Sequence, residues 1–451
     1  MPRKMRQSGV DWIGEIPEGW TCRAIKSLAL AKSSLFADGD WINSVDVSTS
    51  GIRYFTTGNV GQGVFKEQGN GYITQDTFNR LGCLEVHGGD LVISRLNEPI
   101  GRACLIPDSY QRCVVAVDCV VVRPDPEFDK KFLVYAMSSD RYAEQGLLLA
   151  RGTTMQRISR TQLGSIKLPI PPLPVQRNIV QFLDSRCEEL DGIITTSKAV
   201  IEDYKVLKQS IIFEAVTGRL NVAARVRNDG VLAVGAVRGT TAGTPSLRSS
   251  GVDWLGDIPA AWDVVPVKYL LTEVNSRSES GTEEPLSMSQ VLGIVPSSMI
   301  NVANPAASFI GAKKVSPGDL VFNKLKAHLG VFAVSSYEGL VSPDYAVYRS
   351  TSLSDVGYLS YLFHSTNCID EFRRHVRGVG QGLSRLYSSD LFAIKVPLPP
   401  LEEQKRIADM LDEKCGEIDA VVADKERLIA DLETYKKSLI FEVVTGKREV
   451  A

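Results

Sequence analysis

The chain has 451 residues, of which 44% are hydrophobic and 23% are charged, a composition typical of globular rather than disordered proteins. Its formal net charge of −2 argues against a protein that coats nucleic acid by bulk charge. The eight cysteines form no CxxC pair and only four histidines are present, so the sequence offers poor material for a zinc site. It contains no apolar run long enough to span a membrane and no apolar signal segment at its start, so we expect a soluble, cytoplasmic protein.

Four pairs of similar segments recur in the same order along the chain, which indicates an internal duplication. The pairs are SGVDWIGEIPEGW and SGVDWLGDIPAAW (8–20 and 250–262), GDLVISRL and GDLVFNKL (89–96 and 318–325), RGTTMQRI and RGVGQGLSRL (151–158 and 377–386), and two stretches ending in TG (168–218 and 396–446). The last pair aligns without a gap and is identical at 21 of 51 positions. Each half is therefore a variable region followed by a nearly constant segment.

Each half begins with two tryptophans in matching surroundings. We interpret Trp12 and Trp20, with Trp254 and Trp262 in the second half, as packing residues at the start of each unit rather than as base-stacking platforms.

The variable regions are predicted to be mainly β with some helix. Short β-branched runs at 91–94 and 113–122 are bounded by Gly, Pro or Asp, which is typical of strands. Residues 132–144 and 357–374 have the spacing of short amphipathic helices. Residues 221–249 are rich in Ala, Gly, Val and Thr and lack both periodicities, which indicates a linker.

Each constant segment opens with a proline-rich approach, PIPP in the first copy and PLPP in the second. Proline fixes φ and restricts the residue before it, so we expect extended chain there and a helix only beyond it. In the second copy Glu402 and Glu403 occupy the first turn, where carboxylates are favoured by the helix dipole. The first copy has Pro174 and Val175 instead, and both copies end at Thr-Gly, a natural helix stop.

Apolar residues recur along both constant segments with alternating spacings of four and three, the pattern of a coiled-coil seam. After a first step of four, the seam runs through positions 179, 183, 187, 190, 194, 197, 201, 204, 208 and 211 in the first copy and 407, 411, 415, 418, 422, 425, 429, 432, 436 and 439 in the second. The apolar seam residues predicted to pair are Ile179, Leu183, Leu190, Ile194, Ile201, Ile407, Leu411, Ile418, Val422, Ile429 and Leu432. Each helix would be roughly 60 Å long at 1.5 Å per residue. Because both copies lie in one chain, we expect them to pair with each other, and antiparallel pairing suits the domain between them; the alternative is a coiled coil between two chains.

The predicted fold class is therefore α+β. Two mixed α/β domains are separated by two long helices that pair as an antiparallel coiled coil, with internal pseudo-two-fold symmetry.

The sequence carries few signs of catalysis. We find no phosphate-binding loop, no G-x-S-x-G and no H-E-x-x-H. Asp108, Asp129 and Lys131 resemble a nuclease set, which would have to converge on one metal ion. The prolines before Asp129 predict a loop there and the second half shows no evident equivalent, so we interpret these residues as a surface turn. The histidines His87, His328, His364 and His375 are isolated and are interpreted as structural.

These features together resemble the DNA-specificity subunit of type I restriction-modification systems, over about residues 8–220 and 250–448. The resemblance rests on P-L-P-P-L-x-E-Q-x-x-I (397–407), the long helix ending in F-E-x-V-T-G, the I-P-x-x-W unit start and the R-G stretch before each helix. It implies that each variable region is a target-recognition domain that reads one half of a bipartite, asymmetric site in double-stranded DNA. It also implies that the paired helices set the half-site spacing and dock two methyltransferase subunits and the restriction (translocase) subunits.

The resemblance further implies a non-catalytic subunit of a phage-defence complex that acts as a DNA adenine methyltransferase and an ATP-dependent site-specific deoxyribonuclease. This chain would need no metal or cofactor of its own, and S-adenosylmethionine, ATP and Mg²⁺ are expected in the partner subunits. The implied domains are residues 1–168 (first target-recognition domain), 169–219 (first spacer helix), 220–249 (linker), 250–395 (second target-recognition domain) and 396–451 (second spacer helix).

Polar side chains on exposed turns are the candidates for DNA contact, because base edges require polar donors and acceptors and phosphates require cations, hydroxyls or N–H groups. In the first half they are Arg53, Thr57, Asn59, Lys66, Arg95, Asn97, Arg151, Thr153, Thr154, Gln156 and Arg157. In the second half they are Ser289, Gln290, Asn323, Lys324, Lys326, Arg377, Gln381, Ser384 and Arg385. Two alternatives stay open: a self-contained restriction nuclease, and a coiled-coil scaffold that does not read DNA.

Overall fold

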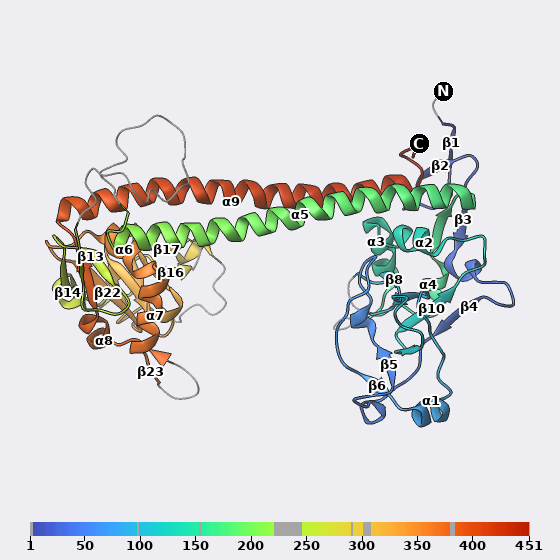
Figure 1. Cartoon of the computed structure of the whole chain (residues 1–451), viewed down its shortest axis with the longest axis horizontal. Coiled ribbons are helices and arrows are strands. Elements are labelled where there is room, and N and C mark those ends of the chain that lie inside the picture. Colours follow the sequence, from blue (N-terminus) through green and yellow to red (C-terminus); the bar gives the residue numbers. More distant parts are fainter. Residues whose placement is uncertain are drawn as a thin grey trace. The chain divides into compact units, whose positions relative to one another are not determined.

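The structure, a computed structural model, describes residues 3–96, 99–152, 156–220, 246–289, 292–300, 308–378 and 384–450. It divides into two compact units: unit 1 comprises Met1–Ser197 and Glu426–Ala451, and unit 2 comprises Lys198–Lys425. Each unit therefore combines one variable region with a stretch of both long helices, α5 (Leu173–Val216) and α9 (Leu401–Val444) (Figure 1).

Unit 1 is built around a four-stranded antiparallel sheet in the order β4-β10-β7-β8. Its strands are β1 (Met5–Gln7), β2 (Glu15–Pro17), β3 (Thr21–Ala24), β4 (Leu35–Asp38), β5 (Ile52–Phe55), β6 (Tyr72–Ile73), β7 (Leu91–Ser94), β8 (Ala103–Leu105), β9 (Cys113–Val115), β10 (Cys119–Arg123) and β11 (Lys167–Ile170). Its short helices are α1 (Gln75–Leu81), α2 (Lys130–Ala136), α3 (Asp140–Leu149) and α4 (Arg160–Ser165).

Unit 2 repeats this sheet in the order β15-β22-β19-β20. Its strands are β12 (Leu247–Ser249), β13 (Asp257–Pro259), β14 (Asp263–Pro266), β15 (Leu271–Val274), β16 (Leu286–Ser289), β17 (Gly293–Pro296), β18 (Lys313–Val315), β19 (Leu320–Asn323), β20 (Phe332–Val334), β21 (Gly339–Val341), β22 (Tyr345–Ser350), β23 (Arg377–Gly378), β24 (Ser384–Arg385) and β25 (Lys395–Leu398). Its short helices are α6 (Val356–His364), α7 (Thr366–His375) and α8 (Ser388–Ala393).

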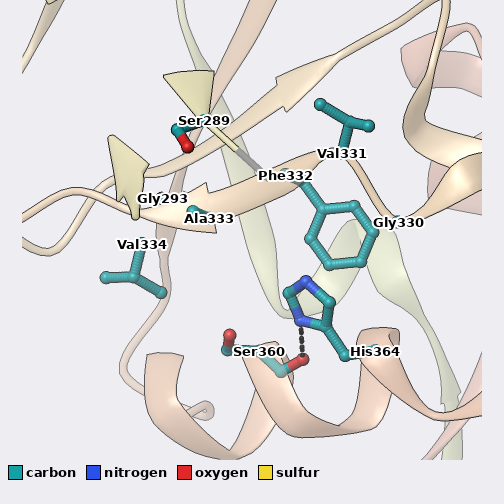
Figure 2. A pocket seen from close by; sticks show the side chains of 9 residues that line it. All are labelled: Ser289, Gly293, Gly330, Val331, Phe332, Ala333, Val334, Ser360 and His364. Atoms are coloured by element: carbon teal, nitrogen blue, oxygen red, sulfur yellow. Dashed lines mark hydrogen bonds between the residues drawn. The ribbon is translucent and has the colours of Figure 1, made fainter. Parts of the chain in front are cut away.

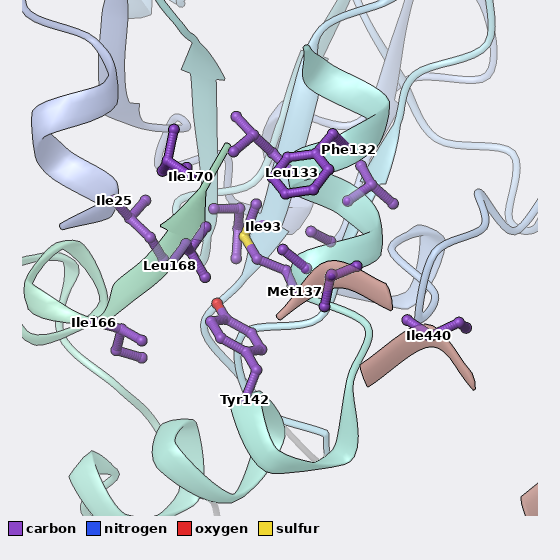
Figure 3. Packing of buried hydrophobic residues seen from close by; sticks show 14 of the residues in the cluster. Ile25, Ile93, Phe132, Leu133, Met137, Tyr142, Ile166, Leu168, Ile170 and Ile440 are labelled. Carbon is purple, nitrogen blue, oxygen red and sulfur yellow. The ribbon is translucent and has the colours of Figure 1, made fainter. Parts of the chain in front are cut away.

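One inner strand of each sheet, β10 or β22, carries apolar side chains on both faces. Because alternate residues of a strand point in opposite directions, these side chains enter two different cores. In β10, Val120 and Val122 join the core that contains the long helices, whereas Val121 belongs to a second core on the other face. In β22, Tyr348 and Val347 divide in the same way between two cores. Figure 3 shows part of the first core, to which α2 contributes Leu133 and β11 contributes Leu168.

The two long helices pair antiparallel within each unit. In unit 1, Leu183 near the start of α5 shares a core with Val443 near the end of α9. In unit 2 the roles are exchanged, and Val216 near the end of α5 shares a core with Leu411 near the start of α9. The predicted class of two mixed α/β domains with two long antiparallel helices is therefore confirmed. Of the eleven predicted seam residues, Val422 and Leu432 are half-buried and the other nine are buried.

A buried glutamine secures each proline-rich approach to the helix that follows. Gln176 donates to the Pro171 carbonyl at 2.9 Å and accepts from the Asp129 N–H at 2.8 Å. Gln404 makes the same two bonds, to the Pro399 carbonyl at 2.9 Å and from the Asp355 N–H at 2.8 Å. The glutamine thus joins the start of each long helix to the short helix of its own variable region.

The helix ends agree with the predicted Thr-Gly stop. Gly218 and Gly446 adopt φ of 72° and 70°, a conformation that residues with a side chain rarely accept. A Cβ on Gly218 would lie 2.4 Å from Pro259, and one on Gly446 would lie 2.6 Å from Pro17. Both stops therefore pack against the start of a unit. The four tryptophans of these starts are buried, as predicted.

Four details of the sequence prediction are wrong. Residues 132–144 and 357–374 do not form single helices, because each is divided into two near a buried serine, Ser139 or Ser365. Residues 113–122 form two strands rather than one, and the end of the predicted linker forms β12, which pairs with β13. Local periodicity could not reveal that pairing, because its partner lies further along the chain.

Candidate nucleic-acid interface

In each unit two arginines face each other across a short antiparallel β-pairing, which we call the arginine hairpin. Arg151 and Arg157 exchange both backbone hydrogen bonds at 2.9 Å. In unit 2, β23 pairs with β24 and sets Arg377 opposite Arg385. Thr153, Thr154 and Gln381, which we predicted to contact DNA, lie outside the described residues. All four arginines are described, so the R-G stretches of the sequence form the same element twice.

Each arginine hairpin is joined to the residue that follows the G-D-L strand. The Ile158 N–H donates to the Arg95 carbonyl at 3.0 Å, and the Leu386 N–H donates to the Lys324 carbonyl at 2.9 Å. Two stretches that the sequence analysis selected separately are therefore brought together in each unit. This junction of hairpin and post-strand loop is the candidate interface.

Acidic side chains neutralise part of the interface in unit 1. Asp118 Oδ1 lies 2.7 Å from Arg157 Nη2 and 3.4 Å from Arg95 Nη2. Asp38 lies 3.3 Å from Arg95 Nε and 3.5 Å from Arg160 Nη1. The Arg95 side chain is buried, so the prediction that it lies on an exposed turn is wrong. Arg157 and Arg151 remain exposed and are the better placed cations.

In unit 2, different ion pairs fix the cations of the interface. Glu273 Oε1 lies 3.4 Å from both Lys324 Nζ and Lys313 Nζ. Lys313 is 2% exposed, and burial lowers its pKa, with a further reduction from the nearby Lys324 cation. Arg377 pairs with Asp390 and, like Arg385, lies over the ring of Tyr387. Arg377 is the more exposed of the two arginines.

The earlier stretch of unit 1 is largely structural. Arg53 is buried and donates to the Gly71 carbonyl at 2.7 Å, and Asn59 is buried and donates to the Gln68 carbonyl at 2.8 Å. The prediction of exposed turn positions is therefore wrong for these two side chains. Lys66 is exposed and Thr57 is half-buried.

The remaining predicted residues are placed as follows. Gln156 is half-buried, and its Oε1 is a buried atom that has no hydrogen-bond partner among the described residues. Asn323 Oδ1 accepts from the Leu325 N–H at 3.1 Å, which gives it a turn-stabilising role. Lys326 is exposed, Ser289 ends β16 and Ser384 starts β24. Asn97 and Gln290 lie outside the described residues.

Sequence reasoning missed the residues that hold these cations. Asp38, Asp118 and Arg160 in unit 1 and Glu273, Lys313 and Asp390 in unit 2 belong to the interface, but they come from separate strands and helices. Spacing alone cannot bring them together. It also missed Arg102, a buried cation whose counterpart in the other half is Val331. Extending the alignment of the GDL segments by a few residues would have exposed that difference.

Unit 2 also contains a cavity of about 300 Å³ between β20, α6, the end of β16 and the start of β17 (Figure 2). His364 lies over Phe332 in its wall, with ring centroids 4.1 Å apart, and its Nδ1 is 2.8 Å from the Ser360 carbonyl. Burial lowers the pKa of His364, which favours the neutral ring. These bonds agree with the structural role predicted for this histidine.

The nuclease-like residues do not converge. The Asp129 carboxylate accepts from the N–H groups of Lys131 and Phe132 and caps α2, whereas Lys131 Nζ lies 2.7 Å from Asp184. Asp355 caps α6 in the second half much as Asp129 caps α2, but Gly357 stands where the first half has Lys131, so the set as a whole has no equivalent there. Within the described part of the chain, no group of three or more His, Cys, Asp or Glu side chains is arranged to hold a metal ion. None of the described helices is both long and apolar enough to span a membrane.

Comparisons with known proteins place this architecture in a family. Residues 17–203 and 298–420 match the family described as the type I restriction modification DNA specificity domain. A putative type I restriction enzyme MjaX specificity subunit from Methanocaldococcus jannaschii is 23% identical over 97% of this chain and 96% of its own length. The type I restriction enzyme EcoKI specificity subunit of Escherichia coli K12 is 20% identical over 96% of this chain and 90% of its own length.

Solved structures share the fold. A chain from a type I R-M system superposes with a TM-score of 0.68 at 16% identity and covers 95% of this chain and 98% of that one. The HsdS subunit from Thermoanaerobacter tengcongensis superposes with a TM-score of 0.52 at 17% identity over 96% of this chain and 98% of its own. The duplicated units, the antiparallel helices and the family match agree, and this chain belongs to the type I restriction modification DNA specificity domain family.

Proposed function

We propose that this chain is the DNA-reading, non-catalytic subunit of a type I restriction-modification complex, and that each unit reads one half of a bipartite site. The observation that carries the proposal is the repeated junction of an arginine hairpin with the loop after the G-D-L strand. Arginine donates two hydrogen bonds at once to a guanine edge or to a phosphate, so exposed arginines suit DNA contact. Two such readers of different sequence in one chain favour an asymmetric site.

The chemistry is proposed to lie in partner subunits. Adenine methylation needs S-adenosylmethionine, and translocation with cleavage needs ATP and Mg²⁺; the proposal assigns these to methyltransferase and restriction subunits. Within this chain the proposed task is to position those subunits on a chosen sequence.

The long helices offer a surface for such partners. In unit 1, Ile193 of α5 and Leu428 and Tyr435 of α9 each directly precede a seam position and are exposed. In unit 2, Val200 and Leu207 of α5 have the same relation to the seam and are half-buried. In an antiparallel pair, positions that precede the seam on both helices lie on one side of the pair. Within each unit this apolar side is suited to a further helix.

On the other side of the helix pair, aspartates that directly follow a seam position bind lysines of the seam. Lys436 bridges to Asp191 at 2.6 Å in unit 1, and Lys208 bridges to Asp419 at 2.7 Å in unit 2. Acidic residues flank the apolar side: Glu189, Asp203, Glu417, Asp424 and Asp431, of which Glu189 pairs with Arg186 and Glu417 with Lys414. We therefore propose that each methyltransferase subunit docks an amphipathic helix whose apolar stripe is bordered by Lys and Arg.

The reading function is tested by co-expressing the chain with its methyltransferase partner and sequencing methylated adenines genome-wide. The native complex is expected to methylate a two-part motif, and Arg151→Ala with Arg157→Ala is expected to lose specificity in one half only. An unchanged motif would support a scaffold that does not read DNA. DNA cleavage by the purified chain alone would support the nuclease alternative.

The docking side is tested by Leu428→Glu, which places a charge on the apolar side. Methyltransferase association, measured by analytical ultracentrifugation, is expected to weaken at least about tenfold. Val206→Glu is the matched control, because Val206 is 70% exposed on α5 but is not adjacent to the seam. Equal weakening by both variants would refute this placement.

The spacing role is tested by inserting one heptad into both long helices. If the helices set the distance between half-sites, the methylated motif keeps both halves and its spacer lengthens. An unchanged spacer would show that they do not act as a ruler.

A further inference from the structure

We infer that Arg102 is a positioning residue that fixes the reading loops of unit 1 before DNA binds, and so determines how strictly that half-site is recognised. The inference rests on the proposed reading function, but neither the sequence analysis nor the family match assigned a role to this residue. Arg102 lies directly before β8 and is 9% exposed.

The Arg102 guanidinium joins two loops that are far apart in sequence. Its Nε donates to the Val60 carbonyl at 2.6 Å and its Nη2 to the Thr57 carbonyl at 2.8 Å. Its Nη1 donates to the Leu96 carbonyl at 2.8 Å and to the Pro99 carbonyl at 3.4 Å. All four acceptors are main-chain atoms, so these bonds fix the path of the backbone rather than a single side chain.

The post-strand loop belongs to the candidate interface, and the Thr57–Val60 turn adjoins it through these bonds. Thr57 was predicted to contact DNA, and Leu96 directly follows Arg95 in the post-strand loop. Leu96 also forms a β-bridge with Arg157 of the arginine hairpin. Arg102 therefore links the Thr57–Val60 turn to the hairpin through a single guanidinium group.

Arginine suits this role for a physical reason. Its planar group carries five N–H donors in a fixed fork, so it can bond carbonyls on two sides at once, whereas lysine offers one compact charge. The backbone of Arg102 is itself held, because its carbonyl accepts from the Ser94 N–H at 2.9 Å. The fork therefore projects from a strand edge whose position is determined by the sheet. Loops that are ordered before binding lose less entropy on binding and discriminate better between sites.

Unit 2 lacks this device, although its backbone is equivalent. The register of β7 with β8 and of β19 with β20 aligns Arg102 with Val331, and the Val331 carbonyl accepts from the Asn323 N–H at 3.1 Å. Val331 is buried and apolar. The loop after β19 instead contains a 3₁₀ turn, Ala327–Leu329, and the His328 carbonyl accepts from Arg373 of α7 at 3.3 Å. Only unit 1 is therefore expected to depend on a guanidinium at this position.

The test uses the assembled methyltransferase complex with Arg102→Lys and Arg102→Val. Methylation rates are measured on the native site and on duplexes that carry one changed base pair in either half. Both variants are expected to reduce discrimination in the unit 1 half-site by about tenfold or more, because hydrogen bonds between loop carbonyls are lost. Discrimination in the other half-site is expected to stay within about twofold of native, since unit 2 does not use this residue.

Val331→Ala is the matched control, because it perturbs the equivalent buried position without touching a loop carbonyl. A general effect of lower stability would relax both half-sites and would appear in Val331→Ala as well, so the melting temperature is measured for every variant. Arg102→Lys keeps the charge and provides the milder case if Arg102→Val does not fold. Unchanged discrimination in Arg102→Lys, or equal relaxation of both halves, would overturn the inference. Absence of a bipartite motif in the native complex would instead refute the proposed function.

Discussion

Units 1 and 2 are alike where the chain joins a long helix and different where it is proposed to meet DNA. Tyr135 donates to Asp184 at 2.7 Å at the joint of unit 1, and Tyr361 donates to Asp412 at the joint of unit 2 at 2.6 Å. The two glutamine joints match as closely. In contrast, Arg102 in unit 1 corresponds to Val331 in unit 2. The duplication has therefore kept a common frame, which consists of the two long helices and their joints to the variable regions. The differences between the units are concentrated in the loops.

One difference does reach the frame. Trp262 donates from Nε1 to Glu403 at 3.2 Å in unit 2, whereas the corresponding position in α5 is Val175 and cannot accept this bond. In unit 1 the Arg3 guanidinium lies 5.2 Å from the centre of the Trp20 ring instead. Glu403 is thus engaged within its own unit. Glu402, in contrast, is exposed and pairs with Lys405 at 3.0 Å.

The largest effect is expected from breaking the glutamine joints. Gln176→Ala and Gln404→Ala each leave a buried carbonyl and a half-buried N–H without their partner, which is expected to cost about 2–4 kcal/mol of unfolding free energy. The two costs should agree within about 1 kcal/mol, because the bonds are the same in both units. Chemical denaturation of the full chain, followed by circular dichroism, measures them. Gln75→Ala on the exposed helix α1 is the control and should cost less than about 0.5 kcal/mol.

The next effect concerns the acids that hold the arginine hairpins. Asp118→Asn removes a negative charge from beside Arg157, and Asp390→Asn does the same for Arg377. Binding of non-cognate DNA by the assembled complex is expected to tighten about threefold to tenfold at low salt. Fluorescence anisotropy at several salt concentrations measures this change.

Glu188→Gln on α5 removes the same charge away from the hairpins and is the control for these variants. The proposed interface predicts little change for it. If Glu188→Gln tightened binding as much as Asp118→Asn, the effect would reflect net charge rather than the hairpins.

A smaller effect is expected from making the two frames alike. Glu403→Val removes the acceptor of Trp262 and gives unit 2 the residue that unit 1 carries, at a cost of about 1 kcal/mol. The reverse change, Val175→Glu, is not expected to stabilise unit 1 by more than about 0.5 kcal/mol, because a new acceptor there is half-exposed. Thermal and chemical denaturation compare the two. If Val175→Glu raised the unfolding free energy by as much as Glu403→Val lowers it, the two helix starts would differ in stability through this residue alone.

The smallest effect is expected at the ion pairs of the helices. Lys436→Met and Lys208→Met each remove a bridge to an exposed aspartate, and such pairs contribute about 0.5 kcal/mol or less. The two losses should be equal and should shrink at high salt, which screens exposed charges. Urea denaturation at low and high salt measures them. A loss above about 1 kcal/mol in one variant alone would show that the pairs are not equivalent.

Most of the frame could be predicted from the sequence, because the relevant signals are local or repeated. The seam at Ile179 and Leu183 follows from spacing along one helix, and the Thr-Gly stops follow from the conformational freedom of glycine. The packing role of the tryptophans followed from their duplicated surroundings. The breaks near Ser139 and Ser365 were not predicted, because apolar periodicity continues across both turns.

The candidate site was predicted in part. Arg151, Arg157, Arg377 and Arg385 were selected, and the structure places them on two equivalent hairpins. Arg53 was misjudged, because a glycine-rich stretch indicates a turn but does not reveal that its carbonyls face inward. The direction of a guanidinium depends on which carbonyls surround it, and those come from other segments of the chain.

The sequence by itself determined the duplication, the two long helices with their seam and stops, and the membership of the chain in a family of DNA specificity domains. Tertiary structure alone decided which cations remain exposed and which are buried among carbonyls or beside acids. The physical reason is that helix and seam signals depend on neighbours a few residues apart. The acids that pair with Arg95, and the Thr57 and Val60 carbonyls that bond Arg102, instead lie about 20 to 60 residues away and meet them only when the sheet forms.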